Sequence, residues 1–264
     1  MSEIKNKVIW ITGASGGIGK ELAIQLAEAG AKIILTARSA DKLEAVRERL
    51  AGAEHWVFPM DLLRVEEIPA FAEKVLAEVG QVDILINNAG ISQRSLAKDT
   101  AIEVDRKIME LDFFAAVALT KAVLSGMLAR QQGHIVAISS VAGKFGPPMR
   151  TAYAAAKHAI IGFMDSLRAE TQADNLKVTV VTPGSVRTDI SVNALEGDGQ
   201  KHNIVDPLIA NGMAVEECAA RMVKGIQRDT PELLIAEGKT RLAVYLRRFF
   251  PRLLFKMITK AQAT

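Results

Sequence analysis

Short apolar runs alternate along the chain with longer segments whose apolar residues recur at helical spacing. The short runs, rich in Val, Ile and Leu, are Val8–Thr12, Lys32–Thr36, His55–Pro59, Ile84–Asn87, His134–Ser139, Val178–Thr182 and Leu233–Ala236. Several of them are apolar throughout, which is typical of parallel strands that are covered on both faces. The helical segments between them are Ile18–Ala29, Asp41–Leu50, Val65–Val79, Val104–Arg130, Ala152–Thr171 and Val215–Gln227. This alternation predicts a single doubly wound α/β domain over residues 1–264, with a central parallel sheet of about seven strands flanked by helices.

The composition is that of a globular protein with a sizeable core. Of the 264 residues, 49% are hydrophobic and 24% are charged, and the net charge is only +3. A charge this small gives no argument for a nucleic acid as partner. The single cysteine, Cys218, forms no intramolecular disulfide and fits a reducing, cytoplasmic setting. The four histidines have no metal-ligand spacing, and no run of about 18 apolar residues predicts a membrane-spanning helix.

A glycine-rich turn follows the first predicted strand. It reads TGASGGIGK from Thr12 to Lys20, with spaced glycines at Gly13, Gly17 and Gly19. Glycine lets a backbone turn tightly and approach a pyrophosphate, which the first N–H groups of the next helix then face. The turn favours a dinucleotide site. Its spacing differs from G-x-G-x-x-G, however, and an ordinary strand–helix turn is the alternative.

The second strand is followed by TARS, Thr36 to Ser39, which bears on the choice of dinucleotide. In such folds an acid near this position holds the ribose 2′-hydroxyl of NAD, whereas an arginine accommodates the 2′-phosphate of NADP. The chain has Arg38 here and no acid before Asp41. We therefore expect NADP(H) as the cofactor, with a solvent-exposed arginine at a helix start as the alternative.

Polar residues also follow the later strands, at the edge where ligands bind in such sheets. They are MDL at Met60–Leu62, NNAG at Asn87–Gly90 and SSVAG at Ser139–Gly143. In YAAAK, which comes next, Tyr153 and Lys157 are four residues apart and so share one face of a helix. Each motif alone would more often be a turn or an ordinary helix surface. Their combination with the glycine turn is what indicates chemistry.

Together, these motifs resemble those of the short-chain dehydrogenase/reductase family, which has a Rossmann fold. The shared pattern is TGxxxGxG at Thr12–Gly19, NNAG, Ser140, YxxxK at Tyr153–Lys157, and PGSVRT at Pro183–Thr188. The stretches TARS, FFAAVALTK and SSVAGK are similar to the branch that contains 11β-hydroxysteroid dehydrogenases. TDISVNA and LAVYLRRFFPRL are similar to its dehydrogenase/reductase member 7B group.

The resemblance implies an NADP(H)-dependent oxidoreductase that interconverts a small-molecule carbonyl and its alcohol by hydride transfer. Tyr153 would be the general acid/base, Lys157 would favour its phenolate form and hold the nicotinamide ribose, and Ser140 would orient the substrate oxygen. Ser139 is the competing choice for the serine. The residues that would hold the cofactor are Gly13, Ser15, Gly17, Ile18, Gly19, Arg38, Ser39, Asp61, Leu62, Asn88, Ala89, Gly90, Tyr153, Lys157, Pro183, Gly184, Val186 and Thr188.

One catalytic position departs from the family pattern. Asp112, inside the mostly apolar stretch IMELDFFAAVALTK, stands where most members have an asparagine. In the family, the backbone carbonyl of this fourth catalytic residue holds a water that leads towards the lysine. A buried carboxylate needs partners or a proton. We therefore expect Asp112 to face inward near the active site, protonated or hydrogen-bonded to a backbone N–H or to water.

Two segments near the C-terminus lie outside the catalytic set. Residues 191–214 have weak periodicity and three glycines, and in the family such a segment closes over the substrate. Their apolar residues favour an apolar substrate, although a packed lid would have the same composition. Residues 240–264 interleave basic and apolar side chains, a pattern typical of a peripheral helix at a membrane surface. Packing against the body or a second subunit is the alternative.

Two other functions remain open at the level of sequence. A 3-oxoacyl-thioester reductase would use the same catalytic residues. A dinucleotide-binding regulator without catalysis is the alternative outside the enzymes; intact Ser140, Tyr153 and Lys157 argue against it, and Asp112 argues for it. The resemblance also implies a homodimer or homotetramer.

Overall fold

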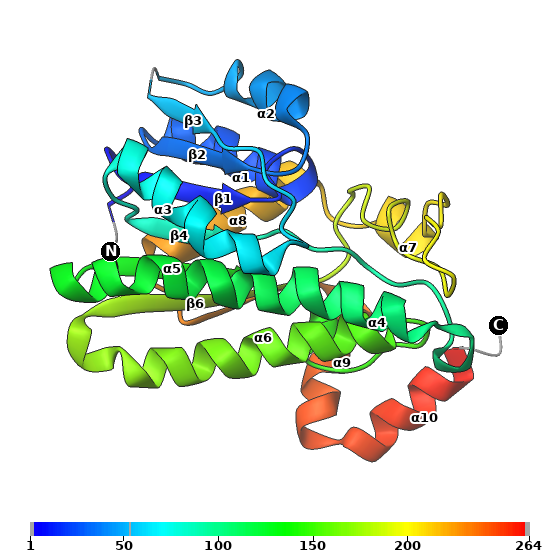
Figure 1. The fold of residues 1–264 in the computed structure, drawn as a ribbon. Coiled ribbons are helices and arrows are strands. Elements are labelled where there is room, and N and C mark those ends of the chain that lie inside the picture. Colours follow the sequence, from blue (N-terminus) through cyan, green and yellow to red (C-terminus); the bar gives the residue numbers. More distant parts are fainter. Residues whose placement is uncertain (1–2, 53, 262–264) are drawn as a thin grey trace.

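One parallel sheet forms the centre of the protein in the computed structural model, which describes residues 3–52 and 54–261 (Figure 1). Within these residues the strand order is β3-β2-β1-β4-β5-β6-β7, and every neighbouring pair is parallel. The strands are β1 (Val8–Thr12), β2 (Lys32–Thr36), β3 (His55–Val57), β4 (Ile84–Asn87), β5 (Gly133–Ile138), β6 (Leu176–Pro183) and β7 (Glu232–Ile235). The predicted doubly wound α/β sheet is confirmed, and the strand order reverses between β1 and β4.

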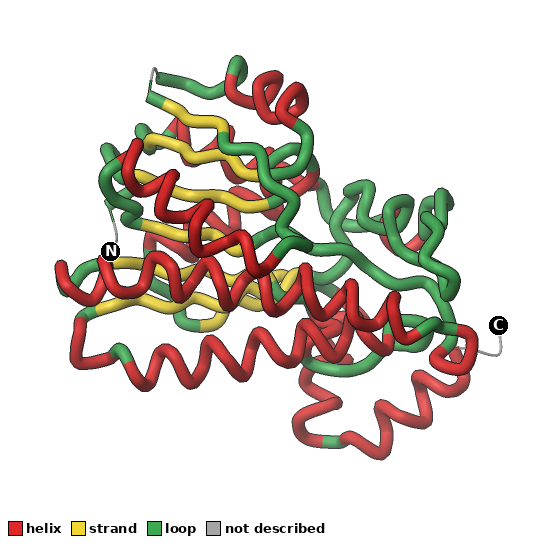
Figure 2. The backbone as a smooth tube through the Cα atoms, in the orientation of Figure 1, coloured by secondary structure: helices red, strands yellow, loops and turns green. Residues whose placement is uncertain are grey.

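Helices cover both faces of the sheet (Figure 2). They are α1 (Gly17–Glu28), α2 (Ala40–Arg47), α3 (Ile68–Val79), α4 (Ile102–Met109), α5 (Ala115–Arg130), α6 (Thr151–Glu170), α7 (Pro207–Ala210), α8 (Val215–Gln227), α9 (Gly238–Phe249) and α10 (Pro251–Ala261). Apolar residues of α1, α2 and α8 pack on one face of the sheet, and those of α3, α5 and α6 on the other.

The strands are apolar throughout because each contributes side chains to both layers of the core. In β1, Ile9 and Ile11 belong to the core layer that contains Leu26 of α1, while Trp10 belongs to the opposite layer, which contains Leu119 of α5. All five side chains are buried to 1% exposure or less. Full burial of such a side chain contributes roughly 1.5–3 kcal/mol, so the two layers together hold the sheet in place.

The long helix predicted for Val104–Arg130 is interrupted. A π-helical turn, Glu110–Phe114, separates α4 from α5 and contains Asp112. Such turns insert an extra residue into the helical repeat and occur often at functional sites. The apolar pattern continues across the interruption, so periodicity alone predicts an unbroken helix.

By length and composition, the helical segment Ile102–Arg130 is apolar enough to cross a membrane. The sequence predicts no membrane-spanning helix when only uninterrupted apolar runs are counted. Length and composition are weak evidence, because a helix that packs in a core passes the same test. Here Leu119, Val123 and Met127 of α5 are buried in the core beside the sheet.

Strand β5 carries a buried histidine that links stability to pH. His134 is 3% exposed, and its Nε2 lies 2.8 Å from Thr179 Oγ1 on β6. Its Nδ1 has no hydrogen-bond partner in the described part of the chain. Burial lowers the pKa of His134 to about 4, with Lys177 acting in the same direction and Asp229 opposing them.

We predict that acid destabilises the protein partly through His134. Since the folded pKa is about 4 and that of a free histidine about 6.5, the unfolded chain binds the extra proton between these values. The free energy of unfolding should therefore fall by roughly 3 kcal/mol as the pH drops through this window. Urea unfolding of wild type and His134→Gln between about pH 7 and pH 4 measures it. Identical pH dependence of the two proteins would contradict the prediction.

Candidate active site

A cleft of about 610 Å³ runs along the edge of the sheet that the carboxyl ends of the strands form. Its wall contains every catalytic and cofactor residue predicted from the sequence except Gly19. Gly19 lies beneath the wall, where an added Cβ would overlap Asn88 Nδ2 and the carbonyl oxygen of Gly13. Its place in the motif therefore reflects close packing of the turn, and the other predicted residues form one continuous surface.

The glycine turn leaves the start of α1 open to this cleft. The N-cap residue Gly16 provides no side-chain hydrogen bond, and the first turn of α1 contains no acid. Gly13 has a φ of 64°, and a Cβ there would lie 2.9 Å from the Cα of Ala89. Both the conformation and the space require glycine. The free N–H groups of the helix start suit a pyrophosphate, so the residues present fit a dinucleotide.

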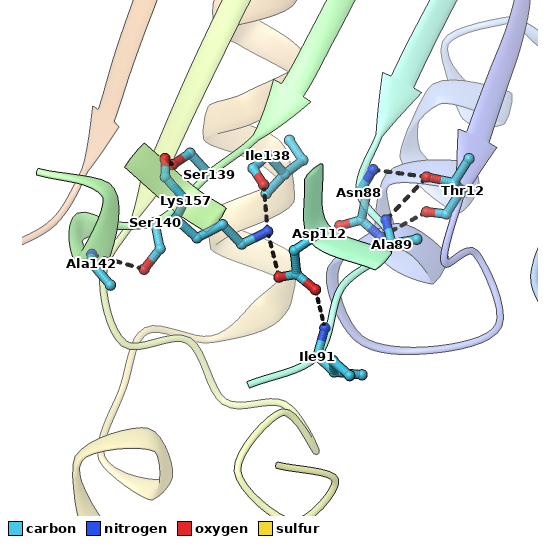
Figure 3. Close-up of polar contacts among 10 residues, drawn as sticks. All are labelled: Thr12, Asn88, Ala89, Ile91, Asp112, Ile138, Ser139, Ser140, Ala142 and Lys157. Carbon is cyan, nitrogen blue, oxygen red and sulfur yellow. Dashed lines mark hydrogen bonds and ion pairs between the residues drawn. The ribbon is translucent and has the colours of Figure 1, made fainter. Parts of the chain in front are cut away.

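The loop after β4 is fastened to the end of β1, at the point where the strand order reverses. Thr12 Oγ1 accepts hydrogen bonds from the backbone N–H groups of Asn88 and Ala89, both at 3.0 Å (Figure 3). In return, Asn88 Nδ2 donates to the carbonyl oxygen of Thr12 at 2.9 Å. These bonds fix the position of Gly90 and the residues that follow it.

At the other end of the cleft, two cations are available to an anionic ligand. Arg38 and Lys42 line the wall, and neither makes an ion pair with a described residue. Ser39 caps α2 by accepting from the backbone N–H of Lys42 at 3.5 Å. Asp61, the acid of the cleft near these residues, accepts a hydrogen bond from the backbone N–H of Leu63 at 3.2 Å.

Tyr153 and Lys157 lie next to each other in the wall of the cleft. Lys157 Nζ lies 5.6 Å from the centroid of the Tyr153 ring and donates to the carbonyl oxygen of Ile138 at 3.1 Å. The two serines differ in what their hydroxyl groups do. Ser139 donates to the carbonyl oxygen of Lys157 at 2.8 Å and so braces α6. Ser140 accepts from the backbone N–H of Ala142 at 3.2 Å, which leaves its own proton available in the cleft.

Asp112 points inward and contacts the lysine directly. Its Oδ2 lies 3.1 Å from Lys157 Nζ, and its Oδ1 accepts the backbone N–H of Ile91 at 2.8 Å (Figure 3). The residue is 3% exposed. A Cβ at Gly90 would lie 2.9 Å from Asp112 Oδ2, so a glycine is required beside the carboxylate. The π-helical turn is what directs this side chain towards α6.

The ion pair changes the protonation of both partners. Burial raises the pKa of Asp112 above its ordinary value, although the charge of Lys157 and the Ile91 N–H act against that rise. Burial alone would lower the pKa of Lys157, but Asp112 and Tyr153 outweigh it and hold that pKa above its ordinary value. Lys157 therefore stays charged, and Asp112 is the partner that takes up a proton when the pH falls.

An ion-pair cluster borders the same cleft, and no sequence motif predicts it. Asp206 Oδ2 lies 2.9 Å from Arg94 and 3.1 Å from Arg150, and Arg150 lines the cleft. Met149, directly before Arg150, has a φ of 61°, which is unusual for a large side chain. These three charged residues are far apart in sequence and form no motif, so only the fold brings them together.

The predicted lid has little regular structure apart from α7. Its residues Leu195 and Ile209 line the cleft, and the Asp206 ion pairs connect it to the body. The apolar residues Ile204, Val205 and Leu208 are instead 60%, 53% and 72% exposed and do not line the cleft. Most of the side chains that led us to expect an apolar substrate therefore do not face it.

Known proteins with similar sequences place the chain in a family. The family description "short chain dehydrogenase" matches residues 7–199. A Drosophila melanogaster protein called dehydrogenase/reductase SDR family protein 7-like is 43% identical over 98% of this chain and 81% of its own length. Dehydrogenase/reductase SDR family member 7B of Mus musculus is 42% identical over 97% of this chain and 81% of its own length.

Solved structures agree. A short-chain dehydrogenase from Streptomyces avermitilis has a TM-score of 0.84 at 27% identity, covering 100% of this chain and 99% of its own. A metagenomic short-chain oxidoreductase in complex with NADP has a TM-score of 0.72 at 32% identity, covering 89% and 98%. A Burkholderia phymatum enzyme in complex with NAD shares the fold, with a TM-score of 0.83 at 22% identity and 96% coverage of both chains.

The protein thus belongs to the short-chain dehydrogenase/reductase family, whose members are oxidoreductases with a dinucleotide-binding fold. Within the family, the chain is similar over most of its length to proteins of the member 7B group, at about 42% identity, as the sequence predicted.

We predict that Asp112→Asn retains or increases turnover near neutral pH. The amide oxygen can still accept a hydrogen bond from the Ile91 N–H. Because the amide is neutral, it no longer offsets the positive charge of Lys157 that acts on Tyr153. The measurement is kcat and kcat/KM across the pH range, with a carbonyl compound that the wild type reduces. Asp112→Ala is the control, since it leaves both Ile91 and Lys157 without this partner and should lower activity. A loss beyond about tenfold in Asp112→Asn, or 1.4 kcal/mol, would refute the account.

Proposed function

We propose that the protein is an NADP(H)-dependent oxidoreductase that interconverts a carbonyl and an alcohol, with Tyr153 as general acid/base. The observation that carries this proposal is the position of the charged Lys157 ammonium, 5.6 Å from the Tyr153 ring in the cleft that the glycine turn borders. A positive charge at this place favours the phenolate form of the tyrosine and so eases proton transfer.

Each catalytic side chain has a separate task in this proposal. The cofactor supplies or accepts the hydride. Tyr153 gives its phenolic proton to the carbonyl oxygen in reduction and takes it back in oxidation. Ser140, whose proton is not engaged by a described residue, donates a hydrogen bond to the same oxygen. Lys157 holds the nicotinamide ribose, while Asp112 and the carbonyl oxygen of Ile138 fix the place of its ammonium group.

The preference for NADP(H) rests on charge. Arg38 and Lys42 line the end of the cleft next to the loop after β2, where a 2′-phosphate would lie, and neither has an acidic partner among the described residues. The related structures include complexes with NADP and with NAD, so the chain's own residues carry this part of the proposal.

An apolar substrate is supported by four side chains in the cleft wall: Ile91, Leu111, Leu195 and Ile209. The wall there also contains Lys107, Arg150 and Lys201, of which the two lysines are exposed. Cations beside an apolar surface would suit an acyl chain on an anionic carrier. This favours a 3-oxoacyl-thioester reductase as the second candidate function. We further propose that the protein works in the cytoplasm as a homodimer or homotetramer.

The test of catalysis is NADPH oxidation with a panel of ketones, aldehydes and one 3-oxoacyl thioester. We expect turnover by the wild type and a loss of about 10²–10⁴-fold in Tyr153→Phe, since that change removes only the acid/base hydroxyl. NADPH binding, measured by fluorescence titration, should be retained in the variant. Tight NADPH binding with no turnover on any compound would instead favour the non-catalytic regulator.

The test of cofactor choice is the charge reversal Arg38→Asp. We predict at least about tenfold weaker NADPH binding and unchanged or tighter NADH binding, because the phosphate loses a cation and meets an anion. Arg49→Asp is the matched control, since Arg49 is exposed and does not line the cleft. Dissociation constants from titration decide the matter. Wild-type protein that binds NADH as tightly as NADPH would overturn the assignment.

A further inference from the structure

The last two helices stand away from the body and expose large apolar side chains. Figure 1 shows α9 and α10 as a hairpin that projects below the rest of the fold. Seven large apolar residues of this hairpin are about half exposed or more: Leu242, Tyr245, Phe249, Phe250, Leu253, Phe255 and Met257. Phe249, the last residue of α9, is 66% exposed, and Phe250, between the two helices, is 63% exposed. So much exposed aromatic surface in one segment indicates a partner that covers it.

The charge of the same segment is entirely positive. After Glu237 the sequence has no acidic residue, but it has seven basic ones: Lys239, Arg241, Arg247, Arg248, Arg252, Lys256 and Lys260. Those from Lys239 to Lys256 are exposed, and none of them makes an ion pair in the described part of the chain. Arg247 instead lies over the ring of Phe255, 5.3 Å from its centroid. The surface that covers the hairpin must therefore be apolar and negatively charged.

We propose that the α9–α10 hairpin binds the surface of an anionic lipid membrane. Its aromatic side chains would enter the boundary between headgroups and acyl chains, and its cations would remain at the phosphates. A second copy of the chain fits less well, because the same face of a partner would bring another set of cations against the first.

The hairpin is attached close to the catalytic cleft. It begins directly after β7, and a Cβ at Gly184 in the cleft wall would lie 3.3 Å from Ala236 and 3.5 Å from Thr240 of α9. Figure 1 shows α10 and the lid helix α7 at the side of the molecule to which the strands point. Two exposed apolar residues, Val205 and Leu208, belong to this lid. Binding through the hairpin would thus hold the substrate side of the enzyme near the lipid.

Flotation of the full-length protein with liposomes tests the proposal. We expect the wild type to float with vesicles that contain phosphatidylglycerol, and not with pure phosphatidylcholine vesicles. Raising the salt should weaken the binding. Phe249→Ser with Phe250→Ser removes the apolar insertion, and Arg247→Glu with Arg248→Glu reverses two charges. The charge reversal should lower the partition coefficient at least tenfold, since one basic residue near such a surface changes partitioning roughly fivefold. The serine pair should lower it as well, because less apolar area enters the boundary.

Two matched controls make the result specific. Ile102→Ser removes a side chain that is 54% exposed on α4, and Lys98→Glu reverses an exposed charge outside the hairpin; both should float like the wild type. NADPH binding reports that each variant is folded. Equal flotation of wild type and hairpin variants would overturn the proposal. A second result would also overturn it: the wild type does not bind anionic vesicles, and the hairpin variants change the oligomeric state in sedimentation. The exposed face of the hairpin would then be a subunit contact.

Discussion

The buried contact between the Lys157 ammonium and the Asp112 carboxylate sets the geometry of the residues around Tyr153. It joins three segments that are separated in the sequence: α6, the π-helical turn before α5 and the loop after β4. Two charges buried this deeply are tolerable only because each has further partners, the carbonyl oxygen of Ile138 for one and the N–H of Ile91 for the other. The ion pair thus fixes the position of the Lys157 ammonium group. The negative charge of Asp112 also partly offsets the positive charge of Lys157 that acts on Tyr153.

Much of the fold and most of the cleft were predictable from the sequence, for identifiable reasons. Strands buried on both faces are apolar throughout, and a cofactor turn needs glycines at fixed places, as the φ of 64° at Gly13 illustrates. The interruption at Glu110–Phe114 was not predictable, because the apolar spacing continues through it. Neither was the cluster of Arg94, Arg150 and Asp206, which are joined only by tertiary structure. In the lid, composition alone could not tell side chains that face the cleft from those that face outward.

The cleft combines two kinds of wall. The half that contains the glycine turn consists largely of backbone and small side chains, with Arg38 and Lys42 at its end. Its other half has larger apolar side chains together with Lys107, Arg150 and Lys201. The first half follows the requirements of a ligand that the whole family shares, and it was accordingly the easier half to recognise.

The π-helical turn lets α4 and α5, which follow each other directly along the chain, pack against two different neighbours. Before it, Val104 and Ile108 of α4 pack with Tyr153 of α6; after it, α5 packs against the sheet. One residue advances an α-helix by about 100°, so the extra residue in the turn sets the rotation of α4 relative to α5. The rotation of the helix at this turn, and not the type of residue at position 112, therefore determines that Asp112 points inward. A single deletion in this turn would rotate α4 away from α6 while leaving every catalytic side chain present in the sequence.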